Sequence, residues 1–168
     1  TRYMTSHEID QMLEVDNPQR IFIRGERQAI LWEAMEASDE IRIKYASKYA
    51  GSSNYWKNSI GMSRGIKKLG VKAQKQAQEA AFQKWANENT LPEEKYIDAL
   101  PQMKQTIAAI TPIEGSMQYL QEAFLRGIEI ISAARTSTAR LDAFYKDYEV
   151  ELDRKVAKRM MTIAKENM

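Results

Sequence analysis

The chain has 168 residues and a net charge of +2; hydrophobic residues make up 43% of it and charged residues 29%. This composition is typical of a globular protein and excludes a disordered chain. Basic residues alternate with acidic ones and form no one-sided stripe, so we expect no nucleic-acid partner. Since the sequence contains no cysteine, disulfides, thiolate metal sites and a cysteine nucleophile are excluded.

The sequence has no apolar run as long as a membrane span and no signal peptide, so we expect no membrane contact. The chain begins with Thr1 instead of Met, and we expect a processed product or a piece excised from a longer protein. Few breakers, 7 glycines and 4 prolines, favour long helices over short strands. The predicted fold is all-α: a single domain over residues 1–168, built as a bundle of long antiparallel helices and helical hairpins.

Helix-start signals punctuate the first part of the chain. The first predicted helix has Ser6 as its N-cap and runs to about Leu13. Asn17-Pro18 predicts a turn, after which a second helix runs toward residue 37. β-branched residues weaken the first half of this helix, and residues 21–24 are the one strand candidate of the chain.

Two well-bounded helices are predicted next. Ser38, followed by two acidic residues, indicates the start of a long helix over residues 41–69. Gly70 is the predicted C-terminal cap of this helix. Residues 71–89 are rich in good helix formers and predict a further helix.

The C-terminal half contains repeated start signals. Residues 90–92 open a segment, Pro101 breaks or restarts it, and Thr111-Pro112 repeats the start signal. Two amphipathic helices follow, separated by a loop near residues 135–138, and the short link predicts that they pack antiparallel. Their apolar stripes consist of Met117, Leu120, Phe124, Ile128 and Ile131 in the first and of Leu141, Tyr145, Tyr148, Leu152, Val156, Met160 and Ile163 in the second.

Catalytic groups are missing from the chain. Its single histidine, His7, lies in a predicted first helical turn, and we interpret it as a solvated or capping residue, not as the base of a Ser-His-Asp triad. One histidine without cysteine argues against a zinc site. The sequence also lacks the Glu-x-x-His pairs of a di-iron site and a phosphate-binding glycine loop. We therefore expect no catalytic residue, no metal and no cofactor.

Residues 43–58 are unusual for a surface helix. One interpretation is tight helix packing, since aromatic stripes usually fill cores. The other is a recognition face, in which a side-chain amide accepts a hydrogen bond from a substrate ammonium group beside an aromatic ring. Helical spacing forms an aromatic face from Tyr45, Tyr49, Trp56 and Ile60 and a small polar face from Ser47, Gly51, Asn54 and Asn58.

The run YASKYAGSSNYWKNSIGMSRG over residues 45–65 resembles a signature of the dipeptidyl-peptidase 7 and 11 family, which includes dipeptidyl aminopeptidase BII. The opening TRYMT, the pair Asn17-Pro18 and the run IFIRG over residues 21–25 fit the same family. The strong likeness covers residues 1–70, and the remainder fits in character as further long helices.

This resemblance implies that the chain is the inserted helical cap domain, or its first part, of a periplasmic serine peptidase with a chymotrypsin-like catalytic β-barrel. Such enzymes release dipeptides from the free amino end of peptides. The family's triad maps onto none of these residues, so the piece alone is expected not to hydrolyse peptides. The implied partners are the peptide substrate, the catalytic β-barrel domain and a second copy of the parent enzyme in a homodimer.

The resemblance also implies a binding role for Asn54, which matches the asparagine that binds the substrate's α-amino group. Tyr55, Trp56 and Asn58 are interpreted as a supporting shell or cleft lining. The alternative function is a stand-alone helical protein–protein interaction module. Such a module would show a large exposed apolar patch away from residues 45–58.

Overall fold

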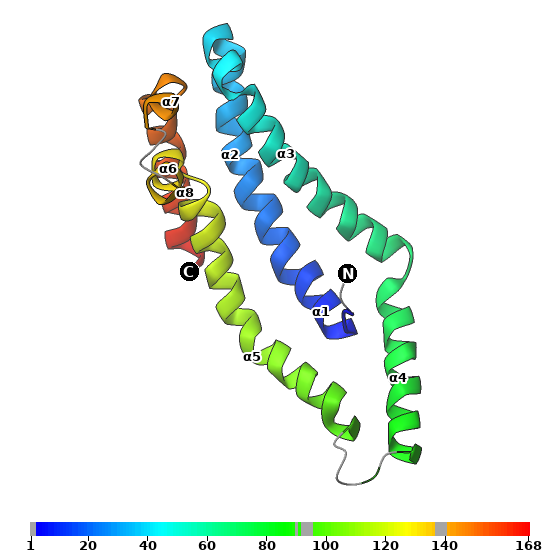
Figure 1. The fold of residues 1–168 in the computed structure, drawn as a ribbon. Helices are drawn as coiled ribbons and strands as arrows, with labels where there is room; N and C mark the ends of the chain where they lie inside the picture. Colours follow the sequence, from blue (N-terminus) through cyan, green and yellow to red (C-terminus); the bar gives the residue numbers. More distant parts are fainter. Residues whose placement is uncertain (1–2, 90, 92–95, 137–140) are drawn as a thin grey trace. The chain divides into compact units, whose positions relative to one another are not determined.

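The computed structural model describes residues 3–89, 91, 96–136 and 141–168. All regular elements in this part of the chain are helices, which confirms the predicted all-α class and leaves residues 21–24 helical instead of extended (Figure 1). The chain divides into two compact units: unit 1 contains residues 1–18 and 61–115, and unit 2 contains residues 19–60 and 116–168. That the chain acts as a single domain stays a prediction.

The N-cap of the first helix lies one residue earlier than predicted. Helix α1 spans Ser6–Gln11, and its N-cap is Thr5, not Ser6. The Thr5 hydroxyl accepts a hydrogen bond from the Glu8 N–H at 3.2 Å, and the Glu8 carboxylate accepts one from the Thr5 N–H at 2.8 Å. This reciprocal capping box satisfies two otherwise free donors of the first turn. Ser6 is instead buried and binds Glu79.

The turn predicted at Asn17-Pro18 is wrong, because the chain stays helical through it, whereas the second helix predicted to run from there toward residue 37 is confirmed. A π-helical turn, η1, spans Met12–Asp16 and leads directly into α2, Asn17–Ala37. The Asn17 N–H donates to the carbonyl of Met12, five residues back. Proline has no N–H and clashes with the preceding turn of an α-helix, so the wider π-turn lets Pro18 continue the helical path.

The two well-bounded helices are confirmed. Helix α3 spans Asp39–Lys68, and the hydroxyl of Ser38 accepts a hydrogen bond from the Ile41 N–H at 3.3 Å. Gly70 has a φ of +61°, the left-handed conformation that glycine adopts at a helix C-terminus. Helix α4 then spans Val71–Asn89. The glycines within α3 do not interrupt it.

Polar contacts connect the helices of unit 1. The Ser6 N–H and hydroxyl both donate to the Glu79 carboxylate at 2.6 Å, which ties the start of α1 to α4. Lys72 on α4 pairs with Asp10 on α1 at 2.7 Å. Gln83 donates to the carbonyl of Ile97 at 2.9 Å, which links α4 to the short 3₁₀ helix η3, Tyr96–Asp98.

The helix after η3 runs longer than its start signals predict. Helix α5 spans Ala99–Tyr119, so Pro101 lies in its first turn, as a restart requires, but Pro112 lies in its interior. The predicted start at Thr111-Pro112 is therefore wrong. The Thr111 hydroxyl donates to the carbonyl of Ile107 at 2.6 Å, a local bond to the preceding turn. Of residues 90–92, where a start was also predicted, 90 and 92 lie outside the described residues.

The first C-terminal amphipathic stripe is split by a second π-turn. After α5 the chain forms η4, Leu120–Leu125, and then α6, Glu129–Thr136. Gly127 lies at the bend between them. The predicted loop near 135–138 is helical at Arg135 and Thr136, and residues 137 and 138 lie outside the described residues.

The last predicted helix is two helices, α7 over Leu141–Lys146 and α8 over Val150–Asn167. They are separated at residues 147–149, where Tyr148 donates its hydroxyl proton to the buried Asp153 at 3.0 Å. The Asp153 carboxylate also accepts from the N–H groups of Glu129 and Ile130 at 2.8 and 3.0 Å. The chain therefore turns here to place this carboxylate against the start of α6.

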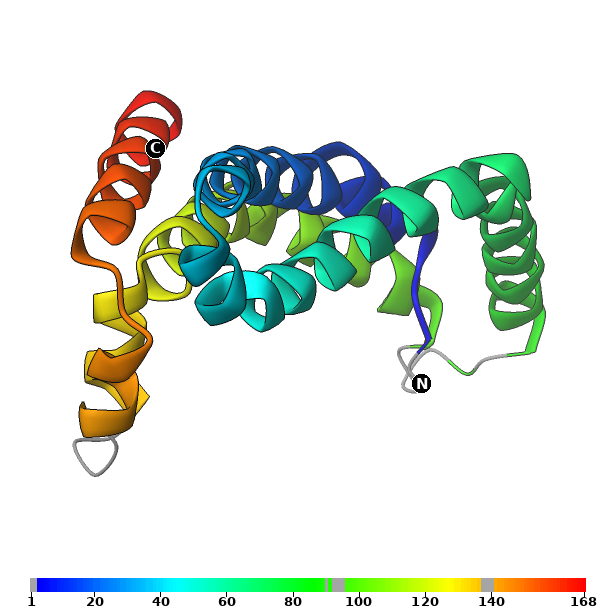
Figure 2. The same ribbon diagram turned by 90° about the horizontal axis from the view of Figure 1, so that it is seen from above.

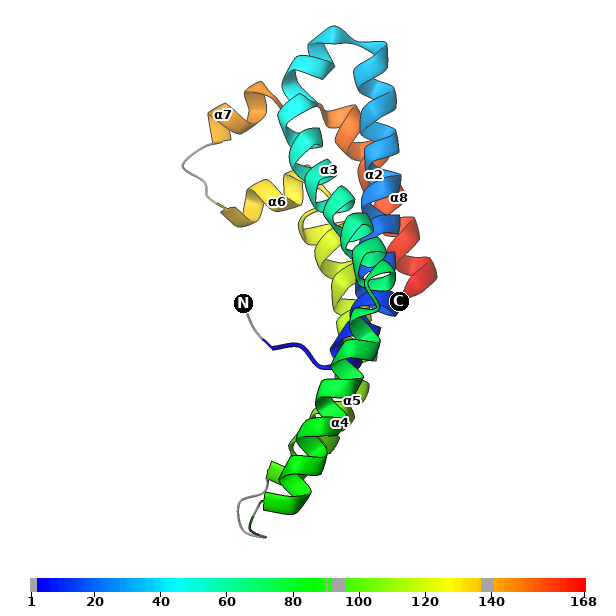
Figure 3. The same cartoon turned by 90° about the vertical axis from the view of Figure 1, so that its right-hand side faces the viewer.

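The apolar core lies in unit 2. Helices α2 and α3 run antiparallel, α8 contacts η4, and α6 and α7 extend to one side of α3 (Figures 1, 2 and 3). Arg159 of α8 also pairs with Glu26 of α2 at 2.8 Å. Within the described residues, no helix has both the length and the apolar character needed to cross a membrane. The buried core residues are Ile23, Leu31, Met35, Tyr45, Tyr119, Ala123, Ile128, Leu152, Val156, Met160 and Ile163.

Candidate functional site

The small polar face of α3 is exposed in unit 2. All four of its members, Ser47, Gly51, Asn54 and Asn58, are exposed. A Cβ added at Gly51 would meet nothing within 4 Å, so no described neighbour uses the space that this glycine leaves. Among the described residues, none forms a hydrogen bond with the Asn54 amide. The amide is therefore open to a ligand, and this face is not packed against another described helix.

The aromatic face of the same helix is partly buried, as expected. Tyr45 is buried in the core, and Tyr49, Trp56 and Ile60 are half-buried. The Trp56 indole N–H donates to the carbonyl of Ile21 on α2 at 3.0 Å, which fixes the ring against that helix. Trp56 therefore holds α3 in place and does not present its N–H to solvent.

Tyr55 lies next to Asn54 and leaves the helix in a different direction from Trp56. Its side chain is 66% exposed. The guanidinium carbon of Arg24 lies 5.0 Å from the Tyr55 ring centroid, within the range of a cation–π contact. Since Arg24 already provides a cation at this ring, Tyr55 is a poorer attractant for a substrate ammonium group than a free tyrosine would be.

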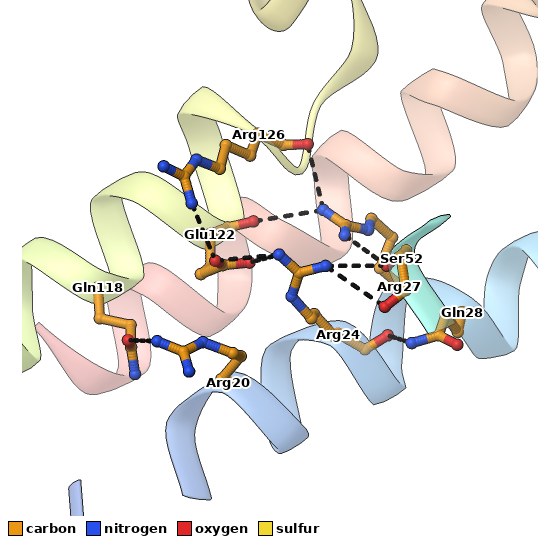
Figure 4. Close-up of polar contacts among 8 residues, drawn as sticks. All are labelled: Arg20, Arg24, Arg27, Gln28, Ser52, Gln118, Glu122 and Arg126. Atoms are coloured by element: carbon orange, nitrogen blue, oxygen red, sulfur yellow. Dashed lines mark hydrogen bonds and ion pairs between the residues drawn. The ribbon is translucent and has the colours of Figure 1, made fainter. Parts of the chain in front are cut away.

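A cluster of buried charged and polar groups lies behind this part of α3. We call Arg24, Arg27, Ser52 and Glu122 the arginine cluster (Figure 4). The Arg24 side chain is 8% exposed and pairs with the 5% exposed side chain of Glu122 at 2.8 Å. Arg24 also donates to the hydroxyl and the carbonyl of Ser52, both at 3.4 Å. One guanidinium thus connects α2, α3 and η4.

Arg27 binds a carbonyl group of the π-turn and the carbonyl of the residue that follows it. It donates to the carbonyls of Glu122 and Arg126 at 3.4 and 3.2 Å, and to the Ser52 hydroxyl at 2.8 Å. The carbonyls at a helix C-terminus carry partial negative charge, so a cation is favourable there. Burial, and then the neighbouring charge of Arg24, lowers the pKa of Arg27 to about 10.

The arginine cluster carries more positive than negative charge. Two buried arginines face one buried carboxylate, and Arg126 adds an exposed third guanidinium 3.5 Å from it. A positive excess does not attract an ammonium ion by itself. An amide oxygen accepts a hydrogen bond without a net charge, so Asn54 would orient a substrate ammonium group more than it would attract it.

A second polar network anchors α3 nearer its start. The Tyr45 hydroxyl donates to the Glu129 carboxylate at 2.8 Å and accepts from the Glu149 N–H at 3.1 Å. Lys44 pairs with Glu149 at 2.5 Å, and Lys48 pairs with Glu129. Burial is the main cause that raises the pKa of Tyr45. These contacts join α3 to the starts of α6 and α8.

The sequence predicted Asn54 but missed the residues behind it. Arg24, Ser52 and Glu122 were not singled out, because the ion pair joins residues 98 positions apart in the chain. One signal was available. Arg20, Arg24 and Arg27 share a helical face within a segment that also holds Ile23 and Leu31 of the core, and arginine on a buried face needs a partner.

The described residues contain no group of three or more His, Cys, Asp or Glu side chains that could hold a metal ion. His7 is half-buried in α1, and no hydrogen bond or ion pair joins its side chain to a serine or a carboxylate among the residues that the structure describes. The structure brings Asn54 and Tyr55 to one exposed turn of α3, and it leaves Asn58 exposed one turn further along.

Comparison with known proteins decides the family. The sequence matches the peptidase S46 family over residues 1–168. The chain belongs to the peptidase S46 family. Among its relatives, dipeptidyl-peptidase 7 of Porphyromonas endodontalis is 41% identical over 99% of this chain and 22% of its own length. The Asp/Glu-specific dipeptidyl-peptidase of Porphyromonas gingivalis is 30% identical over 96% of this chain and 25% of its own length.

A solved structure has the same fold. The crystal structure of Porphyromonas endodontalis DPP11 in complex with the dipeptide Arg-Glu matches with a TM-score of 0.84 and 26% identity. The match covers 100% of this chain and 27% of that one. The resemblance seen in the sequence is thus confirmed at the level of the family. This S46 chain spans about a quarter of the length of the relatives that it matches.

Proposed function

We propose that this S46 chain is the helical cap region of a serine-type dipeptidyl aminopeptidase, and that it helps to bind the α-amino group of the peptide substrate. Membership of the S46 family over all 168 residues supports the dipeptidyl-peptidase assignment, as do the relatives named dipeptidyl-peptidase 7 and Asp/Glu-specific dipeptidyl-peptidase. The DPP11 structures in complex with Arg-Glu and Arg-Asp support a peptide ligand.

The observation that carries the binding role is the state of Asn54. Its amide is exposed and bears no hydrogen bond to a described residue, whereas α3 is anchored at Ser52, Tyr55 and Trp56 on either side of it. A helix that is anchored on both sides of a free amide suits a group that must be placed accurately. Fixing the amino end of a peptide determines which peptide bond reaches the nucleophile, so the product is a dipeptide.

The chemistry itself belongs to the catalytic β-barrel domain in this proposal. Hydrolysis breaks the peptide bond between the second and third residues, and water supplies the hydroxyl of the new carboxylate and a proton of the new amine. The cap contributes by holding the ammonium group and covering the cleft. Closure over the substrate excludes water that competes for the same hydrogen bonds. Tyr55, Trp56 and Asn58 support Asn54 or line this cleft.

Substitution of Asn54 in the full-length enzyme tests the proposal. Asn54→Ala removes one hydrogen bond to a charged group, which is worth about 1.5–3 kcal/mol, so kcat/KM should fall about 10- to 150-fold. Lys57→Ala, which changes another exposed residue of the same helix, is the matched control and should keep wild-type turnover. Wild-type kcat/KM for Asn54→Ala, with a dipeptide still the product, would remove Asn54 from the site.

Two further parts of the proposal rest on the family resemblance alone. The parent enzyme is expected in the periplasm, which cell fractionation with a periplasmic marker tests. It is also expected to form a homodimer, which light scattering of the full-length enzyme tests. A cytosolic fraction would contradict the first, and a monomeric mass at micromolar concentration would contradict the second.

One observation favours the alternative of a helical interaction module. Unit 1, which does not contain residues 45–58, exposes several large apolar side chains, and exposed apolar side chains often mark a protein contact. The test is whether the 168-residue chain self-associates or binds a variant of the parent enzyme from which these residues are deleted; only the second result fits a cap region. The exposed side chains are Phe82, Trp85, Tyr96, Met103, Ile110 and Ile113.

A further inference from the structure

Arg24 contacts α3 on both sides of the residue proposed to bind the substrate. Its guanidinium donates to Ser52, two positions before Asn54 (Figure 4). It also lies over the ring of Tyr55, one position after Asn54. Asn54 itself points into the open. The contacts of Arg24 therefore fix the turn of α3 that carries Asn54 without occupying the Asn54 amide.

Glu122 fixes the guanidinium in turn. Its carboxylate lies 2.8 Å from Arg24, and both side chains are more than nine-tenths buried. Glu122 belongs to the π-turn η4, whose carbonyls Arg27 binds. π-turns are rare in helices and cluster at functional sites. Here the π-turn directs a carboxylate at the arginine that orients α3.

An arginine suits this task better than a lysine. A guanidinium is a planar fork with five donors, so it can bind Glu122 and Ser52 at once while its central carbon lies 5.0 Å from the centroid of the Tyr55 ring. A lysine ammonium keeps the charge opposite Glu122, but it lacks both the fork and the flat face. Replacing Arg24 by lysine therefore keeps the ion pair with Glu122 but removes the contacts that orient α3.

We infer that Arg24 is a positioning residue for amino-end binding: held by Glu122, it orients the α3 turn Ser52–Tyr55 so that the Asn54 amide meets the substrate's ammonium group. This inference rests on the proposed function of Asn54. Arg24 touches no substrate in this scheme. Its loss acts only through Asn54, and this distinguishes it from a residue that merely stabilises the fold.

The test measures how strongly the full-length enzyme prefers a free amino end. The readout is the ratio of two inhibition constants, that of an N-acetylated dipeptide to that of the same dipeptide with a free amino group. Loss of general stability or of the cleft changes both constants together and leaves their ratio unchanged. Arg24→Met should lower the ratio about tenfold, since it weakens one hydrogen bond to a charged group. Arg24→Lys should lower it by part of that factor.

The control variant is Arg20→Met. Arg20 lies one turn earlier on the same helix, but it donates to Gln118 at 3.1 Å instead of contacting α3. This variant should keep the wild-type ratio. If Arg24→Met does not fold, Arg24→Lys decides the question, because it keeps a cation opposite Glu122; its melting temperature is measured alongside.

A double substitution separates this inference from the proposed function. In an Asn54→Ala background the ratio is already reduced, and Arg24→Met should reduce it no further, since coupled residues are not additive. If Asn54→Ala alone leaves the ratio at the wild-type value, the proposed function fails and this inference with it. If Asn54→Ala lowers the ratio but both Arg24 variants do not, only this inference is overturned. An additive effect of Arg24→Met in the double variant overturns it as well.

Discussion

Between η4 and α6 the chain passes so close to its own backbone that only glycine fits. A Cβ at Gly127 would lie 2.2 Å from the carbonyl oxygen of Ala123 and 2.6 Å from that of Glu122. Gly61, in contrast, has open space around the same position. The two glycines therefore have opposite consequences for stability, although both lie within segments that the sequence predicts to be helical.

Gly127→Ala tests this contrast. The added methyl group must push backbone atoms apart, so the free energy of unfolding should fall by about 2–3 kcal/mol. Gly61→Ala is the matched control, and it should raise stability by about 0.5–1 kcal/mol because alanine is the better helix former. Chemical denaturation of the chain measures both. Equal midpoints for Gly127→Ala and the wild type would show that the bend relaxes at no cost.

At the scale of the helices, the sequence predicted the features that depend on residues close in the chain and missed those that depend on long-range contacts. The start of α3 at Ser38, its end at Gly70 and the extent of α4 depend on cap residues and helix formers close in the chain, and all three are confirmed. The second π-turn, η4, and the break at residues 147–149 have contacts to segments distant in the chain. A pattern of apolar residues contains no information about these contacts. One predicted stripe therefore ran through η4 and α6, and the other ran through α7 and α8.

The candidate site shows the same division. The open face with Asn54 follows from helical spacing and is exposed as a recognition face requires. The arginine cluster behind it needs the register of α2 against η4, which a single sequence does not give. In the sequence, this cluster was indicated only by the placement of arginines within an apolar segment.

The start of α6 depends on one carboxylate from another helix. Asp153 of α8 is buried and accepts from the Glu129 and Ile130 N–H groups, which have no partner inside α6. Its negative charge also suits the positive end of the helix. Asp153 therefore links the folding of α6 to that of α8.

Asp153→Asn keeps the shape of this side chain but removes its charge and one acceptor oxygen. We expect the free energy of unfolding to fall by about 2–3 kcal/mol, since a buried N–H loses a charged acceptor. Glu151→Gln is the control: its side chain is 76% exposed, and a surface ion pair with Arg154 contributes at most about 1 kcal/mol. Hydrogen exchange should accelerate at the Glu129 and Ile130 amides in Asp153→Asn alone. Unchanged protection there would mean that α6 holds its start without this cap.

For the molecule as a whole, buried titrating groups make stability depend on alkaline pH. Burial, followed by the hydrogen bond to Asp153, raises the pKa of Tyr148 to about 12 from an ordinary 10.0, and burial raises that of Tyr45 as well. A tyrosine whose pKa is raised on folding stabilises the protein fully below pH 10. The folded state keeps its proton longer than the unfolded state, so this stability is lost as the pH rises from about 10 to about 12.

Arg27 has the opposite sign, which determines the design of the measurement. Its pKa falls from 12.5 to about 10 on folding, so the unfolded chain holds more protons between these values and stability rises with pH there.

The pH dependence of wild-type stability alone mixes the effects of the tyrosines and of Arg27. The difference between the wild type and Tyr148→Phe cancels Arg27, because both proteins contain it. We expect this difference, about 1 kcal/mol near neutral pH from the lost hydrogen bond, to shrink between pH 10 and 12. Denaturation midpoints across this range measure it, with Tyr145→Phe, an exposed member of the same aromatic cluster, as the control. Parallel curves for the wild type and Tyr148→Phe would show that the Tyr148 proton is not held by folding.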